Sequence, residues 1–147
     1  MQKHIKKDPV IRVIDANINR GKEGLRVCEE ITRFLLEDSK LTGELKNARH
    51  AIDPLVRSLV NKKYLLECRY SLKDVGFSIL GKELRRGNVQ DIFLANIQRA
   101  KESVRVLEEF SKLINKHSAL GFKKLRYRIY EIEKKAVKEV AALSDIR

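Results

Sequence analysis

A set of polar residues occurs twice in this 147-residue chain, in the same order and at the same spacing. The string A-N-I-N-R-G-K-E-G-L-R-V-C-E-E-I at residues 16–31 returns at residues 95–110 as A-N-I-Q-R-A-K-E-S-V-R-V-L-E-E-F, with ten of sixteen positions identical. The repeated polar positions include Asn17 and Asn96, Arg20 and Arg99, Glu23 and Glu102, Arg26 and Arg105, Glu29 and Glu108, and Glu30 and Glu109. Shared helix patterning would repeat apolar positions, not a set of polar ones. The chain therefore contains an internal duplication, and its repeated polar residues are the first candidates for chemistry.

Arg20 and Arg99 are the repeated residues best suited to hold an anion. Their guanidinium groups present a fixed fork of donors that matches a phosphate or a carboxylate. Asn17 and Asn96 precede them by three residues on the same side of each helix, although an asparagine there can also serve only to fix helix register. Glu23 and the repeated residues after it have the spacing of ordinary ion pairs on a helix surface.

The segment between the two copies carries a second group of candidates, at residues 67–87. Its charged residues include Arg69, Lys73, Asp74, Lys82, Arg85 and Arg86, and its glycines are Gly76, Gly81 and Gly87. Asp74 followed by Gly76 could hold a magnesium ion while backbone amides and basic side chains bind phosphates. The alternative is a solvated linker, although a connection of this length in a small domain is more often functional.

These residues must be positioned by helices, because apolar residues recur at steps of three and four along most of the chain. The pattern predicts helices at residues 9–37, 41–66, 88–115 and 120–143, with a kink or restart after Asp53 because Pro54 follows it. Each copy is then a helical hairpin, at residues 9–66 and 88–147. We expect one all-α domain over residues 1–147, with four helices related by pseudo-twofold symmetry.

One face of the first and third predicted helices has a distinct pattern. It carries Val10, Ile14, Asn17, Gly21, Gly24, Cys28, Ile31 and Leu35 in the first helix, and Val89, Phe93, Asn96, Ala100, Ser103, Leu107, Phe110 and Ile114 in the third. Gly21 and Gly24 together cost about 2 kcal/mol of helix propensity relative to alanine. Either another helix approaches closely at these glycines or a ligand fills the space between the copies.

Composition restricts the classes of partner. The net charge of +12 would attract a nucleic acid, an acidic membrane or a phosphorylated small molecule. Basic residues are interleaved with glutamates and no nucleic-acid-binding motif is present, which argues against DNA or RNA. No apolar run could span a bilayer or act as a signal peptide, so we expect a cytoplasmic protein in which Cys28 and Cys68 are reduced thiols.

Four strings together resemble a known family: R-V-I-D-A-N-I-N-R-G-K-E-G-L-R-V-C-E-E-I-T-R-F, L-K-N-A-R-H, D-V-G, and A-N-I-Q-R-A-K-E-S-V-R-V-L-E-E-F. They are similar to the monofunctional hydroxymethylpyrimidine phosphate kinase domain of thiamine biosynthesis, often fused ahead of thiamine-phosphate synthase. The resemblance covers residues 10–112. It implies that ATP, with Mg²⁺, phosphorylates hydroxymethylpyrimidine phosphate to the diphosphate, which then passes to thiamine-phosphate synthase.

The resemblance also implies roles for individual residues. Asp74, Arg20 and Arg99 would be catalytic, and Asp74 would in addition bind Mg²⁺. The substrate and its phosphates would contact Asn17, Asn96, Arg69, Gly76, Glu23 and Glu102. Phosphoryl transfer depends on positioning and charge neutralisation, so arginines, one carboxylate and loop amides are sufficient for it.

Two other functions remain open from the sequence. One is a non-catalytic module that binds a pyrimidine phosphate or regulates another protein, and the other is a basic helical nucleic-acid-binding protein. An apolar stripe on long helices is also compatible with a homodimer.

Overall fold

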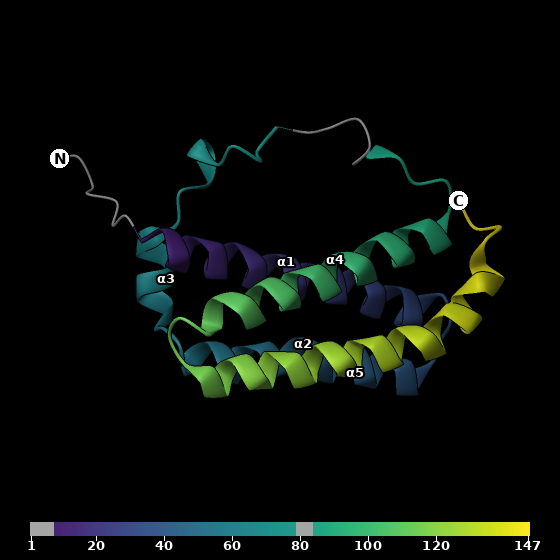
Figure 1. Ribbon diagram of the computed structural model, residues 1–147. Coiled ribbons are helices and arrows are strands. Elements are labelled where there is room, and N and C mark those ends of the chain that lie inside the picture. The colour runs from purple at the N-terminus through teal and green to yellow at the C-terminus, as the bar shows by residue number, and fades with distance from the viewer. Residues whose placement is uncertain (1–7, 79–83) are drawn as a thin grey trace.

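The computed structural model describes residues 8–78 and 84–147 and contains only helices and connecting turns over those ranges. The helices are α1 (Pro9–Phe34), α2 (Ser39–Arg57), α3 (Lys62–Cys68), α4 (Val89–Ser111) and α5 (Lys116–Val140) (Figure 1). Two short 3-10 helices lie at Ser71–Lys73 and Ala141–Leu143. The predicted all-α class is confirmed.

Each of the five α-helices begins at a residue whose side chain accepts a hydrogen bond from a backbone amide of its first turn. The capping residues are Asp8, Asp38, Asn61, Asn88 and Asn115. Asparagine and aspartate are favoured there because the first amides of a helix have no partner within the helix.

The prediction of a single helix at residues 41–66 is wrong. α2 continues past Pro54 to Arg57, and a separate helix, α3, begins only at Lys62. The Oδ1 atom of Asn61 accepts a hydrogen bond from the amide of Tyr64 at 2.8 Å and so caps the new helix. The break therefore follows the proline by several residues, at the point where a capping side chain is available.

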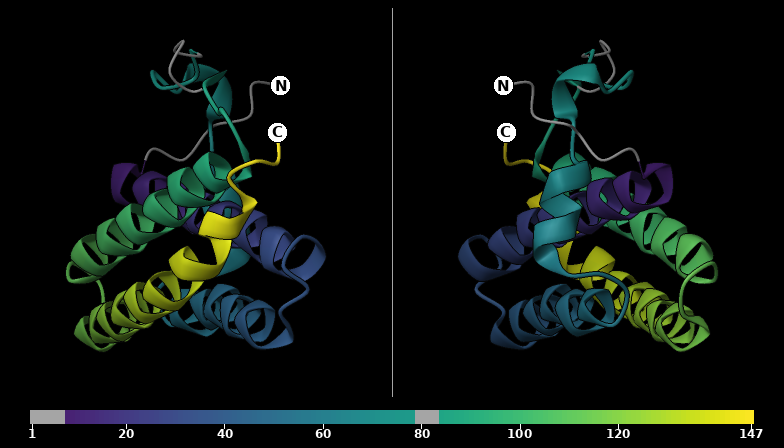
Figure 2. Two further views of the ribbon diagram at one scale, coloured as in Figure 1. Left: turned by 90° about the vertical axis from the view of Figure 1, so that its right-hand side faces the viewer. Right: turned by 90° about the vertical axis from the view of Figure 1, so that its left-hand side faces the viewer.

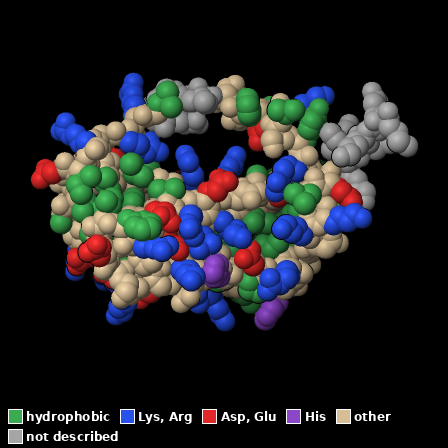
Figure 3. Space-filling model, turned by 180° about the vertical axis from the view of Figure 1, so that it is seen from behind, with side chains coloured by type: hydrophobic (Ala, Val, Ile, Leu, Met, Phe, Trp, Pro, Cys, Tyr) green, Lys and Arg blue, Asp and Glu red, His purple; other side chains and the backbone are tan. Residues whose placement is uncertain are grey.

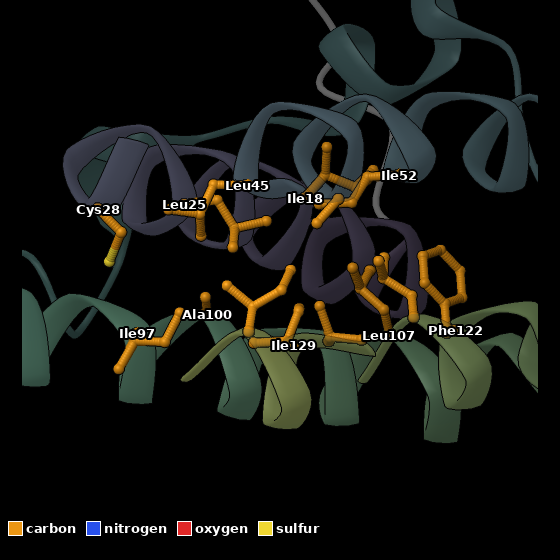
Figure 4. Close-up of a cluster of buried hydrophobic side chains, with 14 of the residues drawn as sticks. Ile18, Leu25, Cys28, Leu45, Ile52, Ile97, Ala100, Leu107, Phe122 and Ile129 are labelled. Carbon is orange, nitrogen blue, oxygen red and sulfur yellow. The ribbon is translucent and has the colours of Figure 1, made fainter. Parts of the chain in front are cut away.

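The helices form two layers. α1 and α4 run antiparallel across each other in one layer, and α2 and α5 lie beneath them (Figures 1 and 2). α1 packs on both α4 and α2, while α5 packs on both α4 and α2. The space between the layers is filled by apolar side chains from all four helices, including Leu25, Leu45, Leu107 and Ile129 (Figure 4). The core is continuous across both copies of the repeat.

The two glycines of α1 allow it to approach α4 closely. A Cβ atom added at Gly24 would lie 2.8 Å from the carbonyl oxygen of Asn96, and one added at Gly21 would lie 3.6 Å from the Cβ of Ser103. Helix contact and not a ligand therefore accounts for the glycines of the predicted face.

Equivalent residues of the two copies make equivalent ion pairs. Lys22 contacts Asp53 at 2.7 Å between α1 and α2, and Lys101 contacts Glu133 at 2.9 Å between α4 and α5. The buried Glu29 and Glu108 are equivalent and each binds an arginine of the following helix, Arg49 and Arg126 respectively, although these two arginines are not at equivalent positions. The duplication that the sequence shows is thus repeated in three dimensions.

Both cysteines are buried and neither forms a disulfide. Burial raises the pKa of the Cys28 thiol, and the charge of Glu133 raises it further. Among the helices in the described ranges, none combines the length and the apolar character that crossing a membrane would require.

Candidate functional site

Residues 69–78 and 84–88 lie between α3 and α4 in the sequence and on the outer side of the α1 and α4 layer; we call these two stretches the strap (Figure 1). The space-filling view shows an opening between the strap and the helices, with acidic and basic side chains beside it (Figure 3). Tyr64 positions the start of this segment, because its hydroxyl donates a 3.1 Å hydrogen bond to the side chain of Asp8, the N-cap of α1.

A cleft of about 740 Å³ lies where the strap begins, above the first half of α1. We call it the strap cleft. It is lined by Pro9, Arg12, Val13, Asp15, Ala16, Asn17, Asn19, Arg20 and Glu23 of α1 and by Arg69, Tyr70, Ser71 and Asp74 of the strap. The volume is that of an ordinary small-molecule site.

A bidentate ion pair closes one side of the strap cleft. The Nε and Nη2 atoms of Arg69 donate to the two carboxylate oxygens of Asp15, both at 2.7 Å. The Asp15 side chain is only 7% exposed, and its hydrogen bond raises the pKa of Arg69, which stays charged. In the second copy the position of Asp15 is taken by Leu94, so this link exists in one copy only.

Arg12 and Arg20 are the free cations of the strap cleft. Both are exposed, and neither makes an ion pair with any residue in the two described ranges. The repeated arginine two turns further on behaves differently, because Arg26 binds Glu30 at 3.0 Å and its counterpart Arg105 binds Glu109 at 3.1 Å. Arg20 has no such structural use, whereas an anion in the cleft would give it a partner.

Asn17 lines the strap cleft from a buried position on α1. Its Nδ2 atom donates to the carbonyl of Val13 at 2.8 Å, and Nδ2 of Asn96 donates to the carbonyl of Ile92 at the same distance. Each asparagine is therefore oriented by its own helix. The Oδ1 atom of Asn17 makes no hydrogen bond to the part of the chain that is described.

The other repeated candidates are not all in one place. Glu23 lines the strap cleft, whereas Asn96, Arg99 and Glu102 belong to α4 and are absent from its lining. Because α1 and α4 are antiparallel and cross near Gly24, the two asparagines lie about 16 Å apart along the helix direction. Along the helix direction, the same estimate offsets Arg20 from Arg99 by about 8 Å, on either side of the crossing.

The strap brings one carboxylate to the cleft. Oδ1 of Asp74 accepts a hydrogen bond from the amide of Gly76 at 2.7 Å, which shapes a tight turn. Asp74 lines the cleft and Gly76 does not. Further along, Arg85 and Arg86 are exposed, while the predicted residues Gly81 and Lys82 lie outside the described ranges.

The residues of this site could bind a magnesium ion only if phosphate oxygens supplied some of its ligands. Within the described ranges no three His, Cys, Asp or Glu side chains gather closely enough to form a metal site. Mg²⁺ in phosphate sites commonly takes one or two protein carboxylates and fills its remaining positions with phosphate oxygens and water. Asp74 can supply such a ligand, with Glu23 on the facing wall.

The polar lining residues that the sequence did not single out are Arg12, Asp15, Asn19, Tyr70 and Ser71. Arg12 and Arg20 are eight residues apart with Ala16 between them, a spacing that places all three on one side of a helix. That stripe was a usable signal for Arg12. Tyr70 carried none, because only the path of the strap brings it to α1.

The fold and cleft define a helical domain that offers a small anionic ligand several arginine side chains and two carboxylates, Asp74 and Glu23, which form no ion pair within the described ranges. Residues 12–135 match the model of the ThiD2 family, and the chain belongs to this family.

The curated proteins related to this chain include several thiamine-phosphate synthases. The protein from Synechocystis sp. is 38% identical over 125 residues, which are 84% of this chain and 35% of that protein. The protein from Rhodopirellula baltica is 33% identical over 136 residues, or 92% of this chain and 36% of its own length. The chain thus spans about a third of these relatives. No solved structure matches it.

Proposed function

We propose that this chain is a small-molecule kinase of thiamine biosynthesis, which transfers the terminal phosphoryl group of MgATP to hydroxymethylpyrimidine phosphate. The observation that carries the proposal is the strap cleft, where Arg12 and Arg20 have no partner among the described residues and stand beside the fixed Arg69. Membership of the ThiD2 family and relatives named thiamine-phosphate synthase support the pathway.

The reaction needs no catalytic base. The acceptor is a phosphate monoester whose second pKa is about 6, so its oxygen is already deprotonated at neutral pH. The bond between the γ-phosphorus and the β,γ-bridging oxygen breaks, a new bond forms to the acceptor oxygen, and ADP leaves. The barrier comes mainly from bringing two anions together, and guanidinium groups reduce that repulsion.

The residues of the cleft divide these tasks. Arg12 and Arg20 bind the phosphate of the acceptor, and Asn17 offers its free Oδ1 to a donor group on the pyrimidine. Arg69, held rigidly by Asp15, lies between acceptor and donor. Arg99 of α4 lies outside the lining of the strap cleft, so no contact with these phosphates is assigned to it.

Magnesium enters with the nucleotide. Asp74 would hold the ion, which neutralises phosphate charge when it is bound. The turn that ends in Gly76 occupies only one oxygen of Asp74 with a hydrogen bond, so the other oxygen is available to a ligand. The metal assignment therefore rests on Asp74, with Glu23 as the other unpaired carboxylate of the lining within the described ranges.

The test is a coupled assay of the purified chain with ATP, Mg²⁺ and hydroxymethylpyrimidine phosphate, in which added thiamine-phosphate synthase reports the diphosphate. Unphosphorylated hydroxymethylpyrimidine is the control. Turnover of the monophosphate alone supports the kinase. If the folded chain binds the pyrimidine phosphate in calorimetry but gives no product, the proposal is wrong and the chain is a non-catalytic binding module.

A further inference from the structure

A second cleft of about 520 Å³ lies on the other side of the Arg69–Asp15 ion pair, between α1, α2 and α3. We call it the helix cleft. Four residues line both clefts: Asp15, Asn19, Glu23 and Arg69. A single layer of side chains therefore separates the two clefts, and ligands bound in both would be close together.

The helix cleft has an apolar floor. The floor consists of Ile18, Val56, Val60, Leu65 and Leu66, contributed by α1, by α2 with the turn after it, and by α3. Leu66 is 50% exposed although it belongs to this apolar set. An apolar floor that remains open to solvent suits the flat face of a heteroaromatic ring.

The polar rim of the same cleft carries four cations and three carboxylates, Asp15, Glu23 and Asp53, so its net charge is +1. The cations are Lys22, Arg57 and Lys62, together with the shared Arg69. Lys22 is paired with Asp53, whereas Arg57 and Lys62 have no ion pair within residues 8–78 and 84–147. Cations around an apolar floor match a ligand that has a ring at one end and phosphates at the other.

The second copy of the repeat is closed at the corresponding place. The counterpart of Val60 is Val140, which is fully buried, and the 3-10 helix Ala141–Leu143 packs against α4 and α5 there. In the first copy α3 takes this position but leaves Val60 half-buried on the cleft floor. The open floor is therefore a departure of the first copy from the second, in the same copy that carries the Asp15–Arg69 pair.

From these observations we infer that the helix cleft binds the purine nucleotide that donates the phosphoryl group. Its base lies on the apolar floor, its phosphates follow the cations of the rim, and its terminal phosphate passes Arg69 to meet the acceptor in the strap cleft. The inference rests on the proposed kinase function, but it assigns the donor to a site distinct from that of the acceptor.

The test compares two variants of the helix cleft with one control. Leu66→Glu places a negative charge at the floor, and Arg57→Glu reverses a charge on the rim. Leu113→Glu makes a similar change at an exposed leucine at the end of α4, outside both clefts. Calorimetry measures the Kd of MgATP and, separately, of hydroxymethylpyrimidine phosphate, and circular dichroism confirms folding.

We expect both cleft variants to weaken MgATP binding by about tenfold or more while the acceptor Kd changes less than about twofold. Leu113→Glu should change neither. The inference is overturned if the wild-type chain binds no MgATP, if neither cleft variant alters MgATP binding, or if acceptor binding falls in parallel. If the wild-type chain shows the expected binding pattern without turnover, the nucleotide site stands and only the kinase activity is refuted.

Discussion

The repeated polar residues separate into two kinds once their contacts are known. Arg26, Glu29 and Glu30 are repeated because they form the same ion pairs on α1 as their counterparts form on α4. Arg20 is repeated without any such contact in the described ranges and lines a cleft. Repetition alone does not distinguish a structural charge from a functional one, whereas the presence or absence of a partner does.

Arg20 and Arg26 allow this distinction to be tested. Replacing Arg20 by alanine should lower kcat/KM of the kinase roughly 100-fold, because a donor to the transferring or acceptor phosphate is lost. Arg26→Ala, a change of equal size on the same helix, should leave kcat/KM nearly unchanged, since its surface pair with Glu30 contributes little. Steady-state kinetics of both variants, with thermal unfolding as a check, measures this. Equal losses in the two variants would contradict the role of Arg20.

We expect Asp15 to hold the strap in place through Arg69 and to make no direct contact with the ligand. Asp15→Leu, the residue found at its counterpart Leu94, removes both hydrogen bonds to Arg69. Since the Arg69 side chain is 41% exposed and stays solvated, we expect the stability to fall by only about 1 kcal/mol or less. Trypsin should nevertheless cut the beginning of the strap faster than in the wild type.

Asp53→Leu is the control for that experiment, because it breaks the ion pair with Lys22 on the neighbouring helix and leaves the strap contacts in place. Mass spectrometry of short digests identifies the cut after Arg69 or Lys73. An unchanged rate of cutting in Asp15→Leu would show that the pair does not hold the strap.

Part of the site could be predicted from the sequence. Asn17, Arg20, Arg69 and Asp74 were selected on repetition, loop composition and family resemblance, and all four line the strap cleft. The partner of Arg69 could not be predicted, because Asp15 is 54 residues away and only the packing of α3 beside α1 brings the two together.

At the scale of the helix, α1 and α4 depend on the small residues at their crossing. Gly24 lies so close to Asn96 of α4 that a methyl group would meet a backbone oxygen, which cannot move aside as a flexible side chain can. Gly43 of α2 provides the contrast, since nothing lies within 4 Å of the Cβ it would gain.

Substitution of these two glycines should therefore change stability in opposite directions. Gly24→Ala should lower the free energy of unfolding by about 1–3 kcal/mol, because overpacking outweighs the gain in helix propensity. Gly43→Ala should raise it by up to about 1 kcal/mol, because only the propensity changes. Urea denaturation followed by circular dichroism gives both values. Stabilisation by both substitutions would mean that α1 and α4 separate easily.

The helices themselves follow from the apolar spacing, and the sequence predicted α1, α4 and α5 to within a few residues. The division of the predicted second helix into α2 and α3 did not follow. A proline was the strongest local signal in that segment, yet α2 continues through Pro54 and the chain breaks at residues 58–61, where Asn61 caps α3. Tertiary packing decided between two possible stopping points.

At the scale of the whole molecule, neither copy of the repeat has a core of its own. The buried cluster takes side chains from all five helices, and the thiol of Cys28 lies 3.7 Å from the carbonyl oxygen of Phe93 in the other copy. The two copies should therefore fold only together.

Separately expressed fragments test this dependence. Residues 1–78 and residues 84–147 should each show little helix alone by circular dichroism, and should gain helical signal when mixed in equal amounts. The gain is expected because the contact between α1 and α4 is rebuilt without the strap. A fragment that folds cooperatively as a monomer would refute a shared core.

The replacement of Asp15 by Leu94 in the second copy has a consequence for how such a site can change. In a symmetric dimer of identical chains, every mutation alters both halves at once, so a residue that improves one binding surface is imposed on the other. A tandem duplication within one chain removes that constraint. One half can acquire an ion pair and an open cleft while the other keeps a leucine and a closed floor, so that two different molecules can meet at a place where symmetry would have demanded two of the same.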